Sequence, residues 1–233
     1  VTTTQGLAAN RMREDGIVDP ELIVISLEGR AHQPLALMVN FSAHPTTLGA
    51  WNRQLSADYP GVVVREVERL VPGALGLFFV GAVGDQAPVK RGEGFERAEW
   101  LGAQLATQAA MTDAKALHVS DTALEAAQQT VPLPRARVRL GKLTLPLWMG
   151  QALVDDDATL TLVRLGSLLL IGVPCDLSAE LGLELKRHAR ERGYQPLIVG
   201  FANDYIGYCL PRRLYETDSY EASLAFNGPD TGE

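Results

Sequence analysis

The stretch PLALMVNFSAHPTTLG, residues 34–49, contains the pattern on which the fold is built. An apolar run rich in branched side chains, residues 35–41, has the length of a β-strand, and His44 and Pro45 follow it directly. Polar residues at strand ends commonly form binding or catalytic sites. Two interpretations of His44 stay open: a metal ligand or general base, or a structural imidazole that hydrogen-bonds a loop carbonyl.

Regular elements are predicted on both sides of this strand. Residues 22–27 form a second apolar run, and the turn-like segment EGRAHQP separates it from the first, which predicts two paired antiparallel strands. Downstream, SADYPGVVVREVERLV offers Ser56 or Asp58 as a cap and Pro60 in a first helical turn. We therefore expect a helix here, followed by a strand at residues 74–80.

The rest of the chain continues this mixture. Residues 81–94 are rich in glycine and proline and predict a loop, and a second helix is expected at 96–111. Residues 117–173 alternate in short strand-like runs, and 178–192 predict a helix with acidic residues early and basic residues late, before a strand at 196–202. This order predicts an α/β fold of layered mixed β-sheets flanked by helices, in a single domain over residues 1–233.

The composition excludes several classes of function. Hydrophobic residues make up 46% of the chain and the formal net charge is −7, with no basic tract, so nucleic acid is not an expected partner. The longest apolar stretch, residues 165–173, is too short to span a bilayer, which predicts a soluble chain. Cys175 and Cys209 form no CxxC pair, and their apolar neighbours predict buried, inert thiols. The sequence begins without Met, so we expect that residues preceding it have been removed.

Polar clusters follow four apolar runs: SAHPT at 42–46, GDQAP at 84–88, PCDLS at 174–178 and NDYIGY at 203–208. Strand ends at one edge of a sheet converge, so these distant clusters are expected to form one site. Each has a structural alternative. Asp85 suits an Asx turn, Asp176 suits the N-cap of the following helix, and the nearby tyrosines suit packing with a hydroxyl that reaches water. No metal-ligand spacing such as HxxxH is present.

Taken in order, these motifs resemble the neutral/alkaline non-lysosomal ceramidase family and its bacterial relatives. The matching segments are ANRMREDGIVDPELIVISLE, VNFSAHPTTLG, SADYPG, GAVGDQAP, GVPCDLSAELG, GFANDYIGY, YETDSYEAS and NGPDTG. The resemblance implies a zinc-dependent amidase of lipid metabolism that cleaves the N-acyl bond of a ceramide-like or smaller substrate. Zinc lowers the pKa of bound water and polarises the carbonyl, which suits this reaction. The family also suggests a secreted or periplasmic location.

The resemblance assigns roles residue by residue. It implies three zinc ligands: His44, Asp176 and Tyr220. It implies catalytic roles for Asp85 and Tyr208, which would orient water or stabilise the tetrahedral intermediate, and for Arg11, which would position the substrate.

Three departures from the family pattern have consequences. Ala87 stands where the family has a serine, which removes a hydroxyl donor. Asp176 stands where the family has a glutamate and is one methylene shorter. The first family zinc histidine belongs to a segment upstream of these 233 residues, so the chain is expected to be the larger, C-terminal part of a catalytic domain. The alternative is a non-catalytic binding or cell-surface module that has kept the fold and lost the metal site.

Overall fold

The structure is a computed structural model that describes residues 1–116, 119, 123–140 and 143–232. Contacts within the chain divide it into two compact units. The first unit comprises Val1–Ala9, Pro20–Val80 and Ala87–His118, and the second comprises Asn10–Asp19, Gly81–Gln86 and Val119–Glu233. The interpretation of residues 1–233 as a single domain stays a prediction.

The elements of residues 1–116 are β1 (Thr2–Thr3), β2 (Ala8–Asn10), β3 (Glu21–Glu28), β4 (Pro34–Phe41), α1 (Asp58–Leu70), β5 (Leu75–Val80), β6 (Gln86–Pro88) and α2 (Gly94–Asp113). Those of residues 123–232 are β7 (Leu124–Pro132), β8 (Arg139–Leu140), β9 (Leu143–Thr144), α3 (Leu147–Gln151), β10 (Asp157–Leu165), β11 (Leu168–Gly172), β12 (Asp176–Leu177), α4 (Ala179–Glu191), β13 (Gln195–Val199), β14 (Tyr208–Cys209), α5 (Arg212–Tyr215) and α6 (Tyr220–Ser223). No helix in the described ranges is long and apolar enough to cross a membrane.

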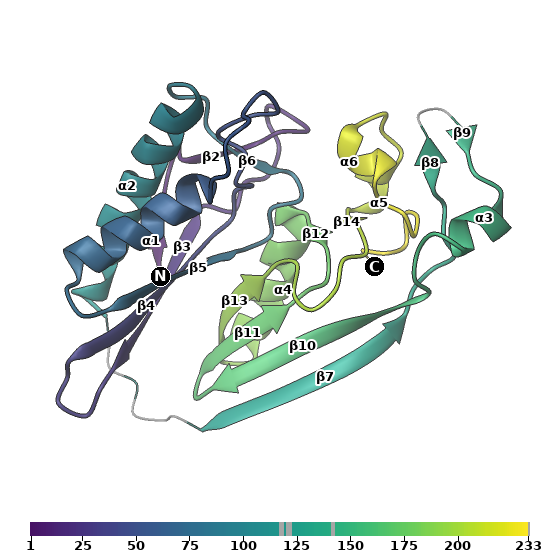
Figure 1. Ribbon diagram of the computed structural model, residues 1–233. Coiled ribbons are helices and arrows are strands. Elements are labelled where there is room, and N and C mark those ends of the chain that lie inside the picture. Colours follow the sequence, from purple (N-terminus) through teal and green to yellow (C-terminus); the bar gives the residue numbers. More distant parts are fainter. Residues whose placement is uncertain (117–118, 120–122, 141–142, 233) are drawn as a thin grey trace. The chain divides into compact units, whose positions relative to one another are not determined.

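The first unit is built on a four-stranded sheet with the order β1-β3-β4-β5. Figure 1 labels β3, β4 and β5 of this sheet. Strands β3 and β4 pair antiparallel, from Leu22 opposite Phe41 to Glu28 opposite Pro34, which confirms the two predicted strands. Strands β4 and β5 are parallel and are connected through α1. The apolar run of residues 35–41 therefore belongs to a β-α-β unit.

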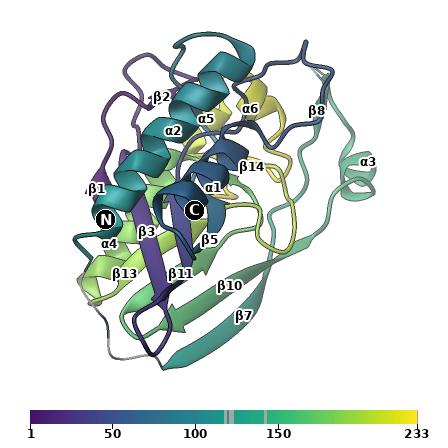
Figure 2. The ribbon, with the colours of Figure 1, turned by 60° about the vertical axis from the view of Figure 1, so that its left-hand side comes forward.

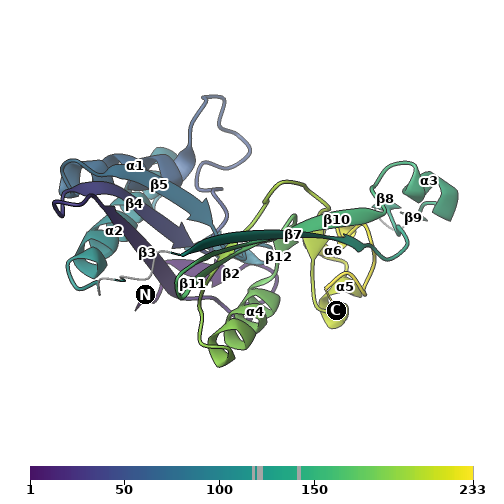
Figure 3. The ribbon, with the colours of Figure 1, turned by 90° about the horizontal axis from the view of Figure 1, so that it is seen from below.

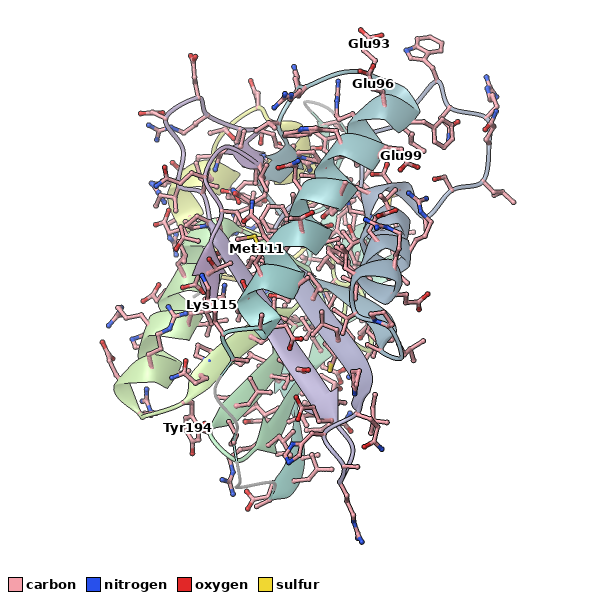
Figure 4. The ribbon with its side chains drawn as sticks, turned by 90° about the vertical axis from the view of Figure 1, so that its left-hand side faces the viewer. Glu93, Glu96, Glu99, Met111, Lys115 and Tyr194 are labelled. Carbon is pink, nitrogen blue, oxygen red and sulfur yellow. The ribbon has the colours of Figure 1, made fainter. Side chains whose placement is uncertain are left out.

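Helices α1 and α2 pack against each other and against this sheet (Figure 2). The two helices approach closely because α2 carries Gly102 at the contact, where a Cβ atom would collide with the side chain of Val62 on α1. Glu93, Glu96 and Glu99 lie at the N-terminal end of α2, and Lys115 lies beyond its C-terminal end (Figure 4). The acidic N-terminal end suits the helix dipole, whereas the last turn contains no basic residue.

The second unit contains another four-stranded sheet, with the order β13-β11-β10-β7 (Figure 1). Strands β7, β10 and β11 are antiparallel neighbours, whereas β11 and β13 are parallel and are connected through α4. A separate parallel pair, β12 and β14, lies at the entrance to α4 and in the segment after β13. This pair carries two of the candidate site residues.

The predicted β-rich region holds one element that was not expected. Strands β7 to β11 confirm its β character, but residues 147–151 form the short helix α3. A helix of five residues shows too little of the 3.6-residue repeat to be recognised in a sequence. Parts of the predicted region, residues 117–118, 120–122 and 141–142, lie outside the described residues.

A buried ion pair connects α4 with the segment Asn10–Asp19 inside the second unit. Lys186 Nζ lies 2.6 Å from Asp19 Oδ2, and the two side chains are 1% and 0% exposed. A buried charge is costly unless an opposite charge compensates it. The pair therefore holds the end of this segment, at Asp19, against α4.

Asp19→Ala should lower the free energy of unfolding by about 3–5 kcal/mol, because it leaves the Lys186 ammonium buried without its carboxylate. Urea denaturation measures the change, and the double variant Asp19→Leu/Lys186→Met should recover most of it. Glu191→Ala is the control, since it removes the exposed ion pair with Arg187 and should cost about 1 kcal/mol or less. Equal losses for Asp19→Ala and Glu191→Ala would contradict the assignment.

Candidate active site

The parallel strands β12 and β14 place a carboxylate beside a phenol. Asp176 on β12 is in register with Tyr208 on β14, and the Asp176 N–H donates to the Gly207 carbonyl at 2.9 Å. Both side chains are buried, at 3% exposure for Asp176 and 4% for Tyr208. Ser178, and not Asp176, is the N-cap residue of α4, so the N-cap interpretation of Asp176 is wrong. Asp176 belongs to the strand that precedes the cap.

The two cysteines flank this strand pair. Cys175 and Cys209 are both free and buried, as the sequence indicated. The hydrogen bond with Cys209, together with burial, raises the pKa of the Cys175 thiol well above its usual value. A thiol that stays protonated is a poor nucleophile, so the structure gives Cys175 a packing role.

Tyr205 holds one oxygen of Asp176. Its hydroxyl donates to Asp176 Oδ2 at 2.8 Å, while half of the residue is exposed. Burial and then this hydrogen bond raise the pKa of Tyr205 well above its ordinary value, so it remains a donor at neutral pH. Tyr205 thereby limits the orientations that the Asp176 carboxylate can adopt.

Arg11 is the cation of the site. Its Nη2 donates to the Tyr208 hydroxyl at 2.6 Å, and its Nε lies 2.7 Å from Glu221 Oε1. The guanidinium carbon is 5.7 Å from the centre of the Tyr208 ring and 5.9 Å from that of Tyr220, and the two rings meet edge to face. Contacts of this kind are favourable between a cation and an aromatic ring. Arg11 therefore connects β14 with α6.

Asp85 connects three segments of the second unit. Its Oδ1 accepts from the Ala179 N–H at 2.8 Å and from Gln86 Nε2 at 3.0 Å, and its Oδ2 accepts from Asn10 Nδ2 at 2.8 Å. The residue is 2% exposed. Because Ala179 is the first residue of α4, the carboxylate caps that helix from a distant loop. The bonds to Ala179 and Asn10 are long-range, unlike those of an Asx turn.

Close backbone contact brings the Asp85 loop to β12. The Gly84 N–H donates to the Leu177 carbonyl at 2.8 Å, and a Cβ atom at Gly84 would lie 2.6 Å from the Asp176 carbonyl oxygen. Any side chain at this position would push the loop away from β12. The glycine of GDQAP is thus required for Asp85 to reach α4.

A cavity of about 230 Å³ adjoins Asp85 in the second unit. Its lining residues are Asn10, Met12, Arg13, Asp15, Gly16, Ile17, Asp85, Glu180, Arg213 and Leu214. Four charged residues of this lining form two ion pairs, Arg13 with Asp15 and Arg213 with Glu180. The cavity is therefore polar but largely neutralised.

His44 lies in the first unit, in a loop that is fixed at both ends. The Tyr59 hydroxyl donates to the Ala43 carbonyl, and Asp58 accepts from the Thr47 hydroxyl at 2.7 Å. Burial and the neighbouring Asp58 carboxylate raise the pKa of Tyr59 well above its usual value, so it remains a donor. His44 is itself buried, at 9% exposure. The SADYPG segment, expected to begin a helix, therefore also anchors the histidine loop.

The second unit brings five of the six candidate residues into one region: Arg11, Asp85, Asp176, Tyr208 and Tyr220. Arg11 contacts Tyr208 and Tyr220 directly, and the Arg11 N–H donates to the Asp85 carbonyl at 2.8 Å. His44 belongs to the other unit. Across the described ranges, no three His, Cys, Asp or Glu side chains form a group that could hold a metal ion. The zinc ligands and the catalytic roles implied by the resemblance stay predictions.

Three residues of this region were not singled out as site residues from the sequence: Asn10, Tyr205 and Glu221. Tyr205 lies in NDYIGY and Glu221 directly follows Tyr220, so both belong to motifs that the sequence predicts to be part of the site. Their importance depends on partners that are remote in sequence, just as Arg11 is 197 positions away from Tyr208. A local pattern cannot reveal such a partner.

These elements together define a ceramidase-like fold, as the sequence resemblance predicted. Neutral ceramidase from Pseudomonas aeruginosa matches 99% of this chain with a TM-score of 0.81 at 19% sequence identity, over 49% of its own length. A ceramidase complexed with C2 matches 99% of this chain with a TM-score of 0.84 at 16% identity, over 50% of its length. No family model matches the sequence, and no curated protein matches it significantly. The chain spans about half the length of the ceramidases that it matches.

The environment of Tyr208 predicts a pH dependence of stability. Burial, and then the negative charge of Asp176, raise the pKa of Tyr208 from 10.0 to about 12, although Arg11 opposes the rise. The folded state thus favours the protonated phenol. This contribution is complete below pH 10 and is lost as the pH rises from 10 towards 12.

Between these pH values the free energy of unfolding should fall more steeply in the wild type than in Tyr208→Phe, when both are unfolded with urea in the presence of a chelator. Ultraviolet titration of the phenolate supplies an independent measurement. The titration midpoint that is missing in Tyr208→Phe belongs to Tyr208. Asp176→Asn should lower this midpoint, because the substitution removes a negative charge next to the phenol. An unchanged midpoint in Asp176→Asn would show that this charge does not act on Tyr208.

Proposed function

We propose that this protein is a ceramidase-like amide hydrolase that separates an acyl chain from an amine. The observation that carries the proposal is the Asp176, Tyr208 and Arg11 cluster in a chain with the fold of neutral ceramidase. A buried carboxylate next to fixed hydrogen-bond donors suits the attack of water on a carbonyl. The substrate is an N-acyl lipid or a smaller N-acyl compound.

The residues of the cluster divide the work of hydrolysis. The water oxygen bonds to the acyl carbon, the C–N bond breaks, and the amine leaves with a proton. Asp176, oriented by Tyr205, accepts the proton from water and returns it to the amine. Tyr208 stays protonated, because its pKa is about 12, and together with Arg11 it donates to the oxygen that becomes negative.

Serine chemistry does not enter this reaction, because Ala87 occupies the position of the family serine. Water is therefore the nucleophile and no acyl-enzyme forms. Asp85 acts at a distance from the reacting atoms, since its carboxylate is committed to Asn10, Gln86 and Ala179. Its contribution is to hold α4 and β12 in place.

Zinc would be held by His44, Asp176 and Tyr220 in the assignment based on resemblance. The proposed ligands in the second unit, Asp176 and Tyr220, do not by themselves fit zinc. Tyr220 is 64% exposed and its ring faces the Arg11 cation. Asp176 is the one carboxylate among the three proposed ligands. A positive guanidinium next to a ligand opposes binding of a second cation. No step above is therefore assigned to a metal.

A second candidate is a binding module without catalysis. It is favoured by the ion pair of Arg11 with Glu221, which already compensates the cation of the site. In this case the cluster would bind an N-acyl compound without cleaving it. Release of the amine distinguishes the two functions.

The hydrolysis test incubates the protein with N-acylsphingosines and with N-acyl amino acids and measures the amine released by mass spectrometry. Asp176→Asn should lower kcat/KM by roughly 100-fold or more, because it removes the proton acceptor. Tyr194→Phe, a tyrosine outside the cluster, is the matched control and should leave kcat/KM unchanged. Binding of these compounds without release of amine would replace hydrolysis by the binding function.

The zinc assignment is tested separately, by elemental analysis of the purified protein. Stoichiometric zinc in the wild type that is lost in His44→Ala would support His44 as a ligand. His32→Ala alters an exposed histidine and should keep the zinc. Zinc retained by His44→Ala would remove His44 from the ligand set, whatever the outcome with N-acyl substrates.

A further inference from the structure

Strand β7 is the outermost strand of the sheet in the second unit (Figure 3). It is nine residues long, LEAAQQTVP, and all of its residues except Val131 are exposed. A strand at the edge of a sheet presents unpaired N–H and C=O groups that can pair with another strand. β7 is therefore a surface for strand addition.

The hydrogen bonds with β10 determine which groups of β7 face outward. The Leu133 N–H donates to the Asp156 carbonyl at 2.7 Å, and the register continues with Pro132 opposite Asp157 and Val131 opposite Ala158. Hydrogen-bonded and non-hydrogen-bonded pairs alternate along an antiparallel ladder. The odd-numbered residues of β7 thus bond to β10. The backbone groups facing away belong to Leu124, Ala126, Gln128, Thr130 and, with its carbonyl alone, Pro132.

This edge lacks the devices that normally prevent pairing. Natural edge strands carry lysines, inward-pointing charges, a central proline or a bulge. The one charged residue of β7, Glu125, is paired across the sheet with Arg164 at 3.1 Å, and the proline is the last residue of the strand. The central residues, from Ala126 to Thr130, are uncharged.

We propose that β7 pairs antiparallel with β7 of a second copy of this chain, about a two-fold axis at Gln128. In that register every outward-facing residue meets another outward-facing residue: Gln128 meets Gln128, Ala126 meets Thr130 and Leu124 meets Pro132. No like charges are opposed, because Glu125 meets Val131. The strand is thus complementary to itself except at its ends, where Pro132 has no N–H to donate to Leu124. An isologous interface requires such self-complementarity.

The pairing joins the two four-stranded sheets into one continuous sheet. Two strands of this length bury less than the roughly 800 Å² per partner of a standard interface, so the dimer should depend on concentration. The two Gln128 amides can hydrogen-bond across the axis, next to the bond that each makes with Thr161 of its own chain.

Sedimentation equilibrium of the 233-residue chain over a wide concentration range tests the proposal, and the wild type should show a reversible monomer–dimer equilibrium. Gln128→Lys brings two ammonium groups together at the axis and should raise the dimer dissociation constant roughly tenfold or more. Gln129→Lys is the matched control: it adds the same charge one residue away, where it meets Ala127 of the other copy, and should change the constant much less.

A second variant tests the backbone bonds without adding charge. Ala126→Pro removes an outward N–H and leaves the ladder with β10 intact, so circular dichroism should be unchanged while dimerisation weakens roughly tenfold or more. A monomer at every concentration would overturn the proposal. Equal effects of Gln128→Lys and Gln129→Lys would also overturn it.

Discussion

The candidate site depends on one carboxylate, that of Asp85. Its two oxygens bond to side chains of Asn10 and Gln86 and to the first N–H of α4, at Ala179. A buried charge with several donors is stable, whereas the same charge with a donor missing is costly. The loops that carry Arg11, the beginning of α4 and strand β12 are consequently held together as one arrangement. The most thoroughly buried acid of the site thus holds other residues in position.

This organisation concentrates the polar chemistry on a very short piece of secondary structure. Strands β12 and β14 have two residues each, yet they set Asp176 beside Tyr208. Tyr205 then donates a hydrogen bond to Asp176, and Arg11 donates one to Tyr208. Because each phenol stays protonated, the cluster offers fixed donors next to one carboxylate. This combination suits a reaction in which the carboxylate takes a proton from water while negative charge develops on a carbonyl oxygen.

The sequence predicted those elements whose pattern is local, and did not predict contacts between residues that are distant in the sequence. Strands β3 and β4 were predicted because apolar runs are local, and α4 was predicted because its charges follow the helix dipole. Strands β12 and β14 are too short to show any periodicity. Asp176 was recognised as a site residue, but its alternative role as an N-cap was wrong, because Ser178 occupies that position. Tyr205 and Glu221 gain their roles from distant partners, which no single motif contains.

The loop after β4 has a consequence for how proteins with this fold can diverge. Its two ends are tied by Tyr59 to Ala43 and by Asp58 to Thr47, while Trp51 and Leu55 between them are almost wholly exposed. Closing a somewhat longer loop between fixed ends adds little entropy cost. Residues can therefore be inserted or exchanged around Trp51 without moving His44. In evolution this segment is free to acquire new recognition surfaces while the histidine keeps its place.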